Sequence, residues 1–320
     1  MKKTILYFLR IVLTAAVVWY FFQKINLEKS FEAVKQADFL IFLSALAVSL
    51  IAWIFNSLRW RQIFLAANIN MPAKKLFLYN LVGVFYGVVL PGGKLTGDAV
   101  CAHRLTEDNS ENGYDKRYFL SILMDRAIGM LTMIFFVSVY FIFKKPFYNL
   151  GWQSDAFGYF LLAADLLGFI LIFTPVFGLV VSKIIKLFAS RWSLLNNIES
   201  ITQVYGQNKR RLYPALLFSI AGVSCLALSV YLLSLSVGLG ASFGAVGFSY
   251  LLATILIVVP ITIGGIGLRE GGITYFLIHL GAPIDGAAAL SILMFAQFAI
   301  VALIGGAIEL YFVVFKKALK

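Results

Sequence analysis

The sequence predicts an all-α integral membrane protein with about six full transmembrane helices and two re-entrant helical hairpins, arranged as two inverted repeats. Three observations lead to this fold class: the composition, the lengths of the apolar runs and the distribution of basic residues. Of the 320 residues, 61% are hydrophobic and only 13% are charged, and the mean hydropathy is +0.90. A soluble domain needs a polar shell, and this chain has too few polar residues to build one.

Six apolar runs are long enough to cross about 30 Å of hydrocarbon, which takes roughly 20 helical residues. They lie at about 4–23, 38–66, 118–143, 157–182, 212–238 and 286–315. No small-residue cleavage site follows the first run, so we expect it to be a retained span rather than a signal peptide.

Two further apolar stretches, 76–90 and 243–259, are short and end at proline and glycine. If each enters and leaves the membrane on one side and the N-terminus is cytoplasmic, 19 of the 27 lysines and arginines are cytoplasmic and 5 are external. A full crossing by 76–90 would move the six basic residues of 183–211 outside, against the positive-inside rule. We therefore expect re-entrant hairpins and a cytoplasmic location for both termini.

The two halves of the chain resemble each other at matching positions. The segment SILM at 121–124 recurs at 291–294, an offset of 170, and the prolines that end the short stretches lie at a similar offset. Inverted repeats with broken helices are typical of transporters. We predict one membrane domain, 1–320, with repeat A at 1–145 (hairpin 76–104) and repeat B at 157–320 (hairpin 243–281).

The second hairpin carries a candidate anion site. Glycines at its break expose backbone N–H groups, a half-helix N-terminus follows, and an arginine fork can bind two phosphate oxygens at once. The alternative is that Glu270 favours the helix N-terminus and pairs with Arg269 or another neighbour. The residues concerned are Gly264, Gly265, Gly267, Arg269 and Glu270.

The first hairpin offers Lys94, Gly97, Asp98 and Arg104. Three roles stay open for Asp98: pairing with a basic residue, relaying protons, or capping a half-helix that starts near Ala99.

Charged residues inside the apolar spans form a further set of candidates, because an intramembrane charge is costly. Asp125 and Arg126 are neighbours on one helix and point in different directions, so we expect each to have its own partner. Arg126 can alternatively snorkel toward the interface. Asp165 is another buried-charge candidate, whereas we expect His279 to be a packed, hydrogen-bonded histidine. Arg59 fits either a headgroup contact or an ordinary interfacial anchor.

No hydrolase, nucleotide-binding or zinc motif occurs, and the chain has two histidines and two cysteines. We expect no metal and no cofactor. The net charge of +12 is spread over short loops, which favours contact with anionic lipid headgroups over nucleic acid.

These motifs together resemble the lysylphosphatidylglycerol synthase/flippase transmembrane family, also called flippase-like domain proteins. The matching segments are Arg59-Trp60, the LPGG…GDA hairpin, Asp125-Arg126 with Gly129, and Pro260 to Glu270. The family usually has an arginine three residues after the hairpin aspartate, where Cys101 stands here, and Thr96 replaces the first glycine of a doubled pair. Whether Arg104 replaces the missing arginine stays open.

The resemblance implies a multi-pass protein of a bacterial or archaeal cell (inner) membrane that moves lipids between leaflets. The lipid would be an anionic phospholipid such as a phosphatidylglycerol derivative, or a polyprenyl-phosphate-linked lipid. The alternatives are a lipid-modifying transferase of the phosphatidylglycerol lysyltransferase type and a non-transporting subunit of such a synthase. In fused relatives a soluble domain transfers the amino acid, and we expect none here because five residues follow the last span. Protein partners would be a second copy of the chain or a partner synthase.

Overall fold

The computed structural model describes residues 27–90, 93–107, 116–144, 154–173, 205, 208–257, 265 and 267–316. Within them every regular element is helical, which confirms the predicted all-α class for this part of the chain. The helices are α2 (Leu27–Lys35), α3 (Phe39–Ala66), α4 (Ala73–Val89), α5 (Lys94–Glu107), α6 (Lys116–Lys144), α7 (Ser154–Phe173), the 3₁₀ turn η3 (Lys209–Arg211), α10 (Leu212–Ser236), α11 (Phe243–Leu256), α12 (Leu268–His279) and α13 (Ile284–Lys316).

Four helical segments are long and apolar enough to cross a membrane: Phe39–Ala66, Leu120–Lys144, Leu212–Ser236 and Ile284–Val314. They coincide with four of the six predicted spans. The predicted span at 157–182 overlaps α7, whose apolar part, Ala156–Ile172, is shorter. The predicted span at 4–23 lies outside the described residues, so the total of six stays a prediction.

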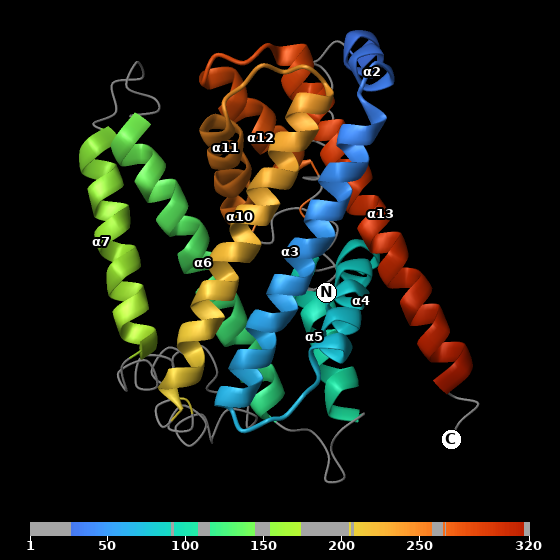
Figure 1. The fold of residues 1–320 in the computed structure, drawn as a ribbon, viewed down its shortest axis with the longest axis vertical. Helices are drawn as coiled ribbons and strands as arrows, with labels where there is room; N and C mark the ends of the chain where they lie inside the picture. The colour runs from blue at the N-terminus through green and yellow to red at the C-terminus, as the bar shows by residue number, and fades with distance from the viewer. Residues whose placement is uncertain are drawn as a thin grey trace, which may run out of the picture.

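Helices α3 and α10 pack along each other through the middle of the molecule (Figure 1). Small residues make this close approach possible: Ala45 and Ala52 are fully buried on α3, and Gly222 of α10 lies against Ala52 and Phe55. The Ser229 hydroxyl of α10 donates to the Ala45 carbonyl across the contact (2.8 Å). Small residues and interhelical hydrogen bonds are what hold helices together where lipid removes the hydrophobic driving force.

Two pairs of short helices lie in opposite halves of the molecule. Figure 1 shows α4 and α5 in its lower half and α11 and α12 in its upper half. The helices of each pair pack on one another, and they coincide with the predicted hairpins at 76–104 and 243–281. At a rise of 1.5 Å per residue, helices of 12 to 17 residues span roughly 18–26 Å, less than the hydrocarbon core.

The long helix α13 contacts both short pairs. Its N-terminal half packs against α12, where the Thr274 hydroxyl donates to the Ala287 carbonyl. Its C-terminal half packs against α4, where a Cβ on Gly305 would lie 2.0 Å from the Leu81 carbonyl oxygen. Phe298, between these contacts, packs on the same apolar cluster of α4 and α13 as Val88 does, and it lies under the Arg269 guanidinium of α12. Helix α13 therefore connects the two pairs, with Phe298 between its two contacts.

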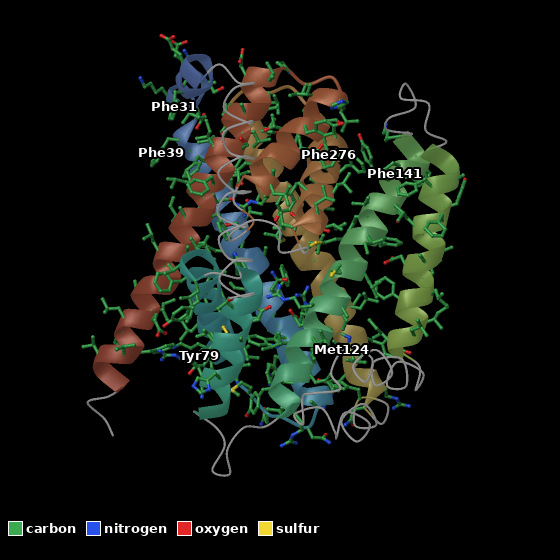
Figure 2. All side chains as sticks on the ribbon, turned by 180° about the vertical axis from the view of Figure 1, so that it is seen from behind. Phe31, Phe39, Tyr79, Met124, Phe141 and Phe276 are labelled. Atoms are coloured by element: carbon green, nitrogen blue, oxygen red, sulfur yellow. The ribbon has the colours of Figure 1, made fainter. Side chains whose placement is uncertain are left out.

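The largest apolar cluster occupies the end of the molecule that holds α4 and α5. Tyr79 of α4 and Met124 of α6 are buried in it and lie in the lower half of Figure 2. Cys101 and Leu105 of α5 belong to the same cluster. The amphipathic helix α5 thus has one face against α4 and α6, which leaves its polar residues to reach neighbouring helices from the other faces.

Gly97 permits the contact between α4 and α5. A Cβ at this position would lie 2.1 Å from the Gly83 carbonyl oxygen and 3.1 Å from the Gly87 nitrogen, both backbone atoms that cannot rotate away. The predicted site residue Gly97 is therefore required for packing, whatever its part in binding.

Gly97→Ala is expected to destabilise the protein by about 1–3 kcal/mol, the usual cost of overpacking, because α4 and α5 must separate. The melting temperature of the purified protein in detergent measures this. Gly247→Ala is the matched control, since a Cβ on this helical glycine meets only the Ala227 side chain at an ordinary 3.5 Å. Equal melting temperatures for the two variants would contradict the packing role.

Candidate functional site

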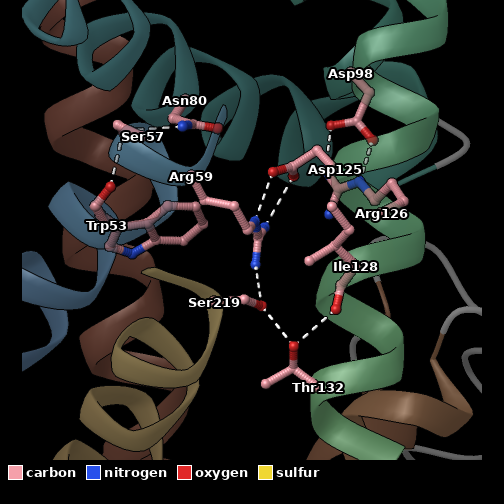
Figure 3. A network of polar contacts seen from close by, with 10 residues as sticks. All are labelled: Trp53, Ser57, Arg59, Asn80, Asp98, Asp125, Arg126, Ile128, Thr132 and Ser219. Carbon is pink, nitrogen blue, oxygen red and sulfur yellow. Dashed lines mark hydrogen bonds and ion pairs between the residues drawn. The ribbon is translucent and has the colours of Figure 1, made fainter. Parts of the chain in front are cut away.

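Arg59 of α3 and Asp125 of α6 form a two-pronged ion pair in the interior (Figure 3). The Arg59 Nε and Nη2 atoms donate to the two carboxylate oxygens of Asp125 at 2.7 Å and 2.9 Å. Arg59 is 7% exposed. Parallel charge-assisted bonds of this kind are the strong form of the interaction and fix the relative position of the two helices.

The remaining Arg59 nitrogen, Nη1, donates to the Ser219 hydroxyl of α10 at 3.1 Å. Ser219 in turn shares a 2.7 Å hydrogen bond with Thr132 of α6, as Figure 3 shows. Gly129 leaves room for the guanidinium, because a Cβ there would lie 3.1 Å from Nη1. Arg59 is buried and joins three helices inside the protein, instead of standing exposed at the end of α3 as an ordinary anchor would.

Arg126 of α6 pairs with Asp98 of α5 rather than with the partner of its neighbour (Figure 3). Its Nε donates to one carboxylate oxygen at 2.8 Å and its Nη2 to the other. The prediction that Asp125 and Arg126 have separate partners is confirmed. Two alternatives are wrong: Arg126 does not snorkel away, and Asp98 does not cap a helix at Ala99, because α5 begins at Lys94.

Helix α5 forms another ion pair, with Glu309 of α13, a residue that the sequence analysis did not select. Arg104 pairs with Glu309, and the Tyr86 hydroxyl of α4 donates to the same carboxylate oxygen at 2.7 Å. Glu309 is 5% exposed, and its other oxygen has no hydrogen-bond partner within the described residues. The sequence was sufficient to find it, because Glu309 is an acidic residue inside the predicted span 286–315 and Asp165 was selected by the same criterion.

In the second hairpin, Arg269 and Glu270 pair with each other. The Arg269 Nη2 donates to a Glu270 oxygen at 2.7 Å, and the other oxygen accepts the Gly267 N–H at 2.9 Å. Glu270 therefore caps the start of α12 by accepting the Gly267 N–H, as its alternative role predicted, whereas Gly267 has no side chain with which to complete a capping box. The Arg269 guanidinium also lies 4.3 Å from the centre of the Phe298 ring, within cation–π range.

The backbone at this break has the conformation that its glycines predict. Gly265 and Gly267 have φ angles of +75° and +81°, in the left-handed region that other residues rarely adopt. The predicted site residue Gly264 and the side chain of Lys94 lie outside what the structure describes. Among the residues that it describes, no group of three histidine, cysteine or acidic side chains is placed to hold a metal ion.

Comparison with known proteins places this arrangement in a family. A family model described as the lysylphosphatidylglycerol synthase TM region matches residues 7–306. The chain belongs to this family. It is also 24% identical over 342 aligned positions to a UPF0104 membrane protein of Pyrococcus horikoshii, with 97% of each chain covered. Together with its apolar helices, these matches identify an integral membrane protein, as the sequence motifs predicted.

Helix α5 contains the position at which the family resemblance implies an arginine. Cys101 stands there and is buried against α4, with its Sγ 2.9 Å from the Tyr79 carbonyl oxygen. This position has no room for a guanidinium. Arg104, one turn further along α5, reaches Glu309 instead. The first hairpin thus supplies a paired arginine, Arg104, from a different turn of the helix.

The candidate residues therefore form three ion-paired groups rather than one cluster. The first group joins α3, α6 and α10 around Arg59. The second joins α5 to α6 and α13 through the Asp98 and Arg104 pairs, and the third is the Arg269–Glu270 pair in the first turn of α12. His279, at the end of α12, hydrogen-bonds through Nδ1 with the Tyr275 carbonyl (2.8 Å) and lies against the Tyr275 ring. The histidine is hydrogen-bonded as predicted, but it is exposed rather than packed in the interior.

Proposed function

We propose that the chain moves lipids with anionic headgroups between the two leaflets of a cell membrane. The lipid is a phosphatidylglycerol derivative or a polyprenyl-phosphate-linked lipid. Family membership supports the membrane setting and the link to lipid, and the paired arginines of the interior supply the chemistry for a phosphate group.

The observation that carries the proposal is the partial exposure of two interior arginines. The side chain of Arg126, which pairs with Asp98, is 29% exposed, and that of Arg104, which pairs with Glu309, is 27% exposed. A lipid phosphate presents two oxygens to a guanidinium as a carboxylate does. It can therefore replace Asp98 or Glu309 without leaving the arginine unpaired, which would be costly at this depth.

We also infer that α4–α5 and α11–α12 are re-entrant hairpins of two inverted repeats, with both termini cytoplasmic. Their short lengths, their place in opposite halves of Figure 1 and their packing on the shared helix α13 support this topology. In transporters with inverted repeats, broken helices meet near the midplane, where the substrate binds. The Arg269–Glu270 group at the break of the second hairpin would then face the same path as Arg126.

Reconstituted protein is expected to accelerate leaflet exchange of a fluorescent phosphatidylglycerol without ATP. The measurement is the fraction of label that dithionite reaches with time, against protein-free vesicles. The matched lipid control is a fluorescent phosphatidylcholine, whose headgroup carries no net charge and should exchange more slowly.

Exchange at the protein-free rate would refute the proposal. Transfer of lysine from charged tRNA to phosphatidylglycerol would instead support the transferase alternative. Restoration of such transfer only on addition of a purified soluble synthase domain would support the role of a synthase subunit.

A further inference from the structure

Asp165 is a buried carboxylate that none of the three ion-paired groups uses. It lies in the middle of α7 and is 1% exposed. Neither of its oxygens has a hydrogen-bond partner among the residues that the structure describes. Buried polar groups in proteins are nearly always satisfied, and an ionised carboxylate without a partner is the costliest exception.

The packing of α7 on α6 shows what surrounds Asp165 (Figure 1). A Cβ on Gly158 would contact Phe141 and Ile142, and a Cβ on Gly168 would contact Leu131. The two helices therefore run antiparallel, and Asp165, three residues before Gly168, lies opposite Ile134. Leu161 and the buried Ile172 lie on the same face of α7, so Asp165 points into an apolar contact.

No charged side chain of α6 lies near this level. Arg126 and Lys144, the flanking charged residues, are eight and ten residues from Ile134, roughly 12 Å and 15 Å along the axis. The Ser138 hydroxyl donates to the Ile134 carbonyl at 2.8 Å. Two tyrosines of these helices do not serve as partners of Asp165 either. Tyr140 of α6 stacks on Phe248 of α11, and Tyr159 of α7 is 59% exposed.

We propose that Asp165 is a proton-binding site, carried as the neutral carboxylic acid while α7 packs on α6. Release of the proton leaves a carboxylate that only water can stabilise here, so it requires α7 to move away from α6. Helix α6 also carries Asp125 and Arg126, whose partners are on α3 and α5. Departure of α7 removes the helix that packs on this face of α6, which frees α6 to shift and so to change both ion pairs. Asp165 is then a coupling site for protons. This link to transport rests on the proposed function.

Infrared spectroscopy of the reconstituted protein tests the proton directly, because a protonated carboxyl has a carbonyl stretching band that a carboxylate lacks. At neutral pH the native chain should show this band, and it should shift in heavy water. Asp165→Asn should lose the band, whereas Glu28→Gln, which removes an exposed carboxyl on α2, should keep it. A heavy-carbon carboxyl label on aspartate should shift the band in the native chain, which needs no variant.

The inference is overturned if the native chain shows no such band at neutral pH, or if the aspartate label leaves the band unmoved. The pH dependence of lipid exchange gives the second arm. Asp165→Asn, a mimic of the protonated state, should exchange lipid at a rate that no longer varies with pH. A band without any lipid exchange by the native chain would refute the proposed function and leave the proton site standing.

Discussion

Arg59→Ala is expected to lower the free energy of unfolding by about 3–5 kcal/mol, the usual cost of removing one partner of a buried ion pair. The substitution leaves Asp125, whose side chain is 14% exposed, without its two strongest hydrogen bonds. It also removes the Ser219 contact, so α3, α6 and α10 lose the group that joins them. Unfolding of the purified protein by SDS in mixed micelles measures the change.

Arg61→Ala is the matched control for this prediction. Arg61 lies two residues further along α3 and is not part of the Arg59 network, so its loss should change stability little. A double variant, Arg59→Met with Asp125→Leu, should recover most of the lost stability because no buried charge is left alone. If Arg59→Ala and Arg61→Ala unfold alike, the ion pair does not hold these helices together.

Arg269→Ala is expected to fold and insert normally but to lose lipid exchange, down to the protein-free rate. Glu270 would still accept the Gly267 N–H and face the N-terminus of α12, which stabilises its charge without the arginine. A bound lipid phosphate, by contrast, would lose its guanidinium. Arg269→Lys should restore only part of the rate, since an ammonium keeps the charge but lacks the two-pronged fork.

The dithionite exchange assay measures this effect, with Arg210→Ala as the control because Arg210 is exposed in η3. Normal exchange by well-folded Arg269→Ala protein would end the proposed role of this arginine. Misfolding of Arg269→Ala, with recovery in an Arg269→Ala/Glu270→Ala double variant, would show instead that the pair is structural.

The candidate residues could be predicted from the sequence because charged residues are costly, and therefore rare, inside apolar membrane spans. Asp98, Asp125, Arg126 and Arg269 stand out in apolar surroundings, and the glycines beside Pro260 indicate a broken helix. Helix direction alone also predicted that Asp125 and Arg126 have different partners. Glu309 was missed although the criterion that selected Asp165, an acidic residue inside an apolar span, applied to it equally.

The sequence by itself determined the all-helical membrane class, four of the spans, the two pairs of short helices and the positions of the interior charges. These follow from local properties: the length of apolar runs and the conformational freedom of glycine. Only the tertiary structure decided the pairings, such as Arg59 with Asp125, 66 residues apart, and Arg104 with Glu309, 205 residues apart. Such pairs depend on which helix faces meet and at what depth, and close contacts such as Gly97 with Gly83 and Gly305 with Leu81 set both.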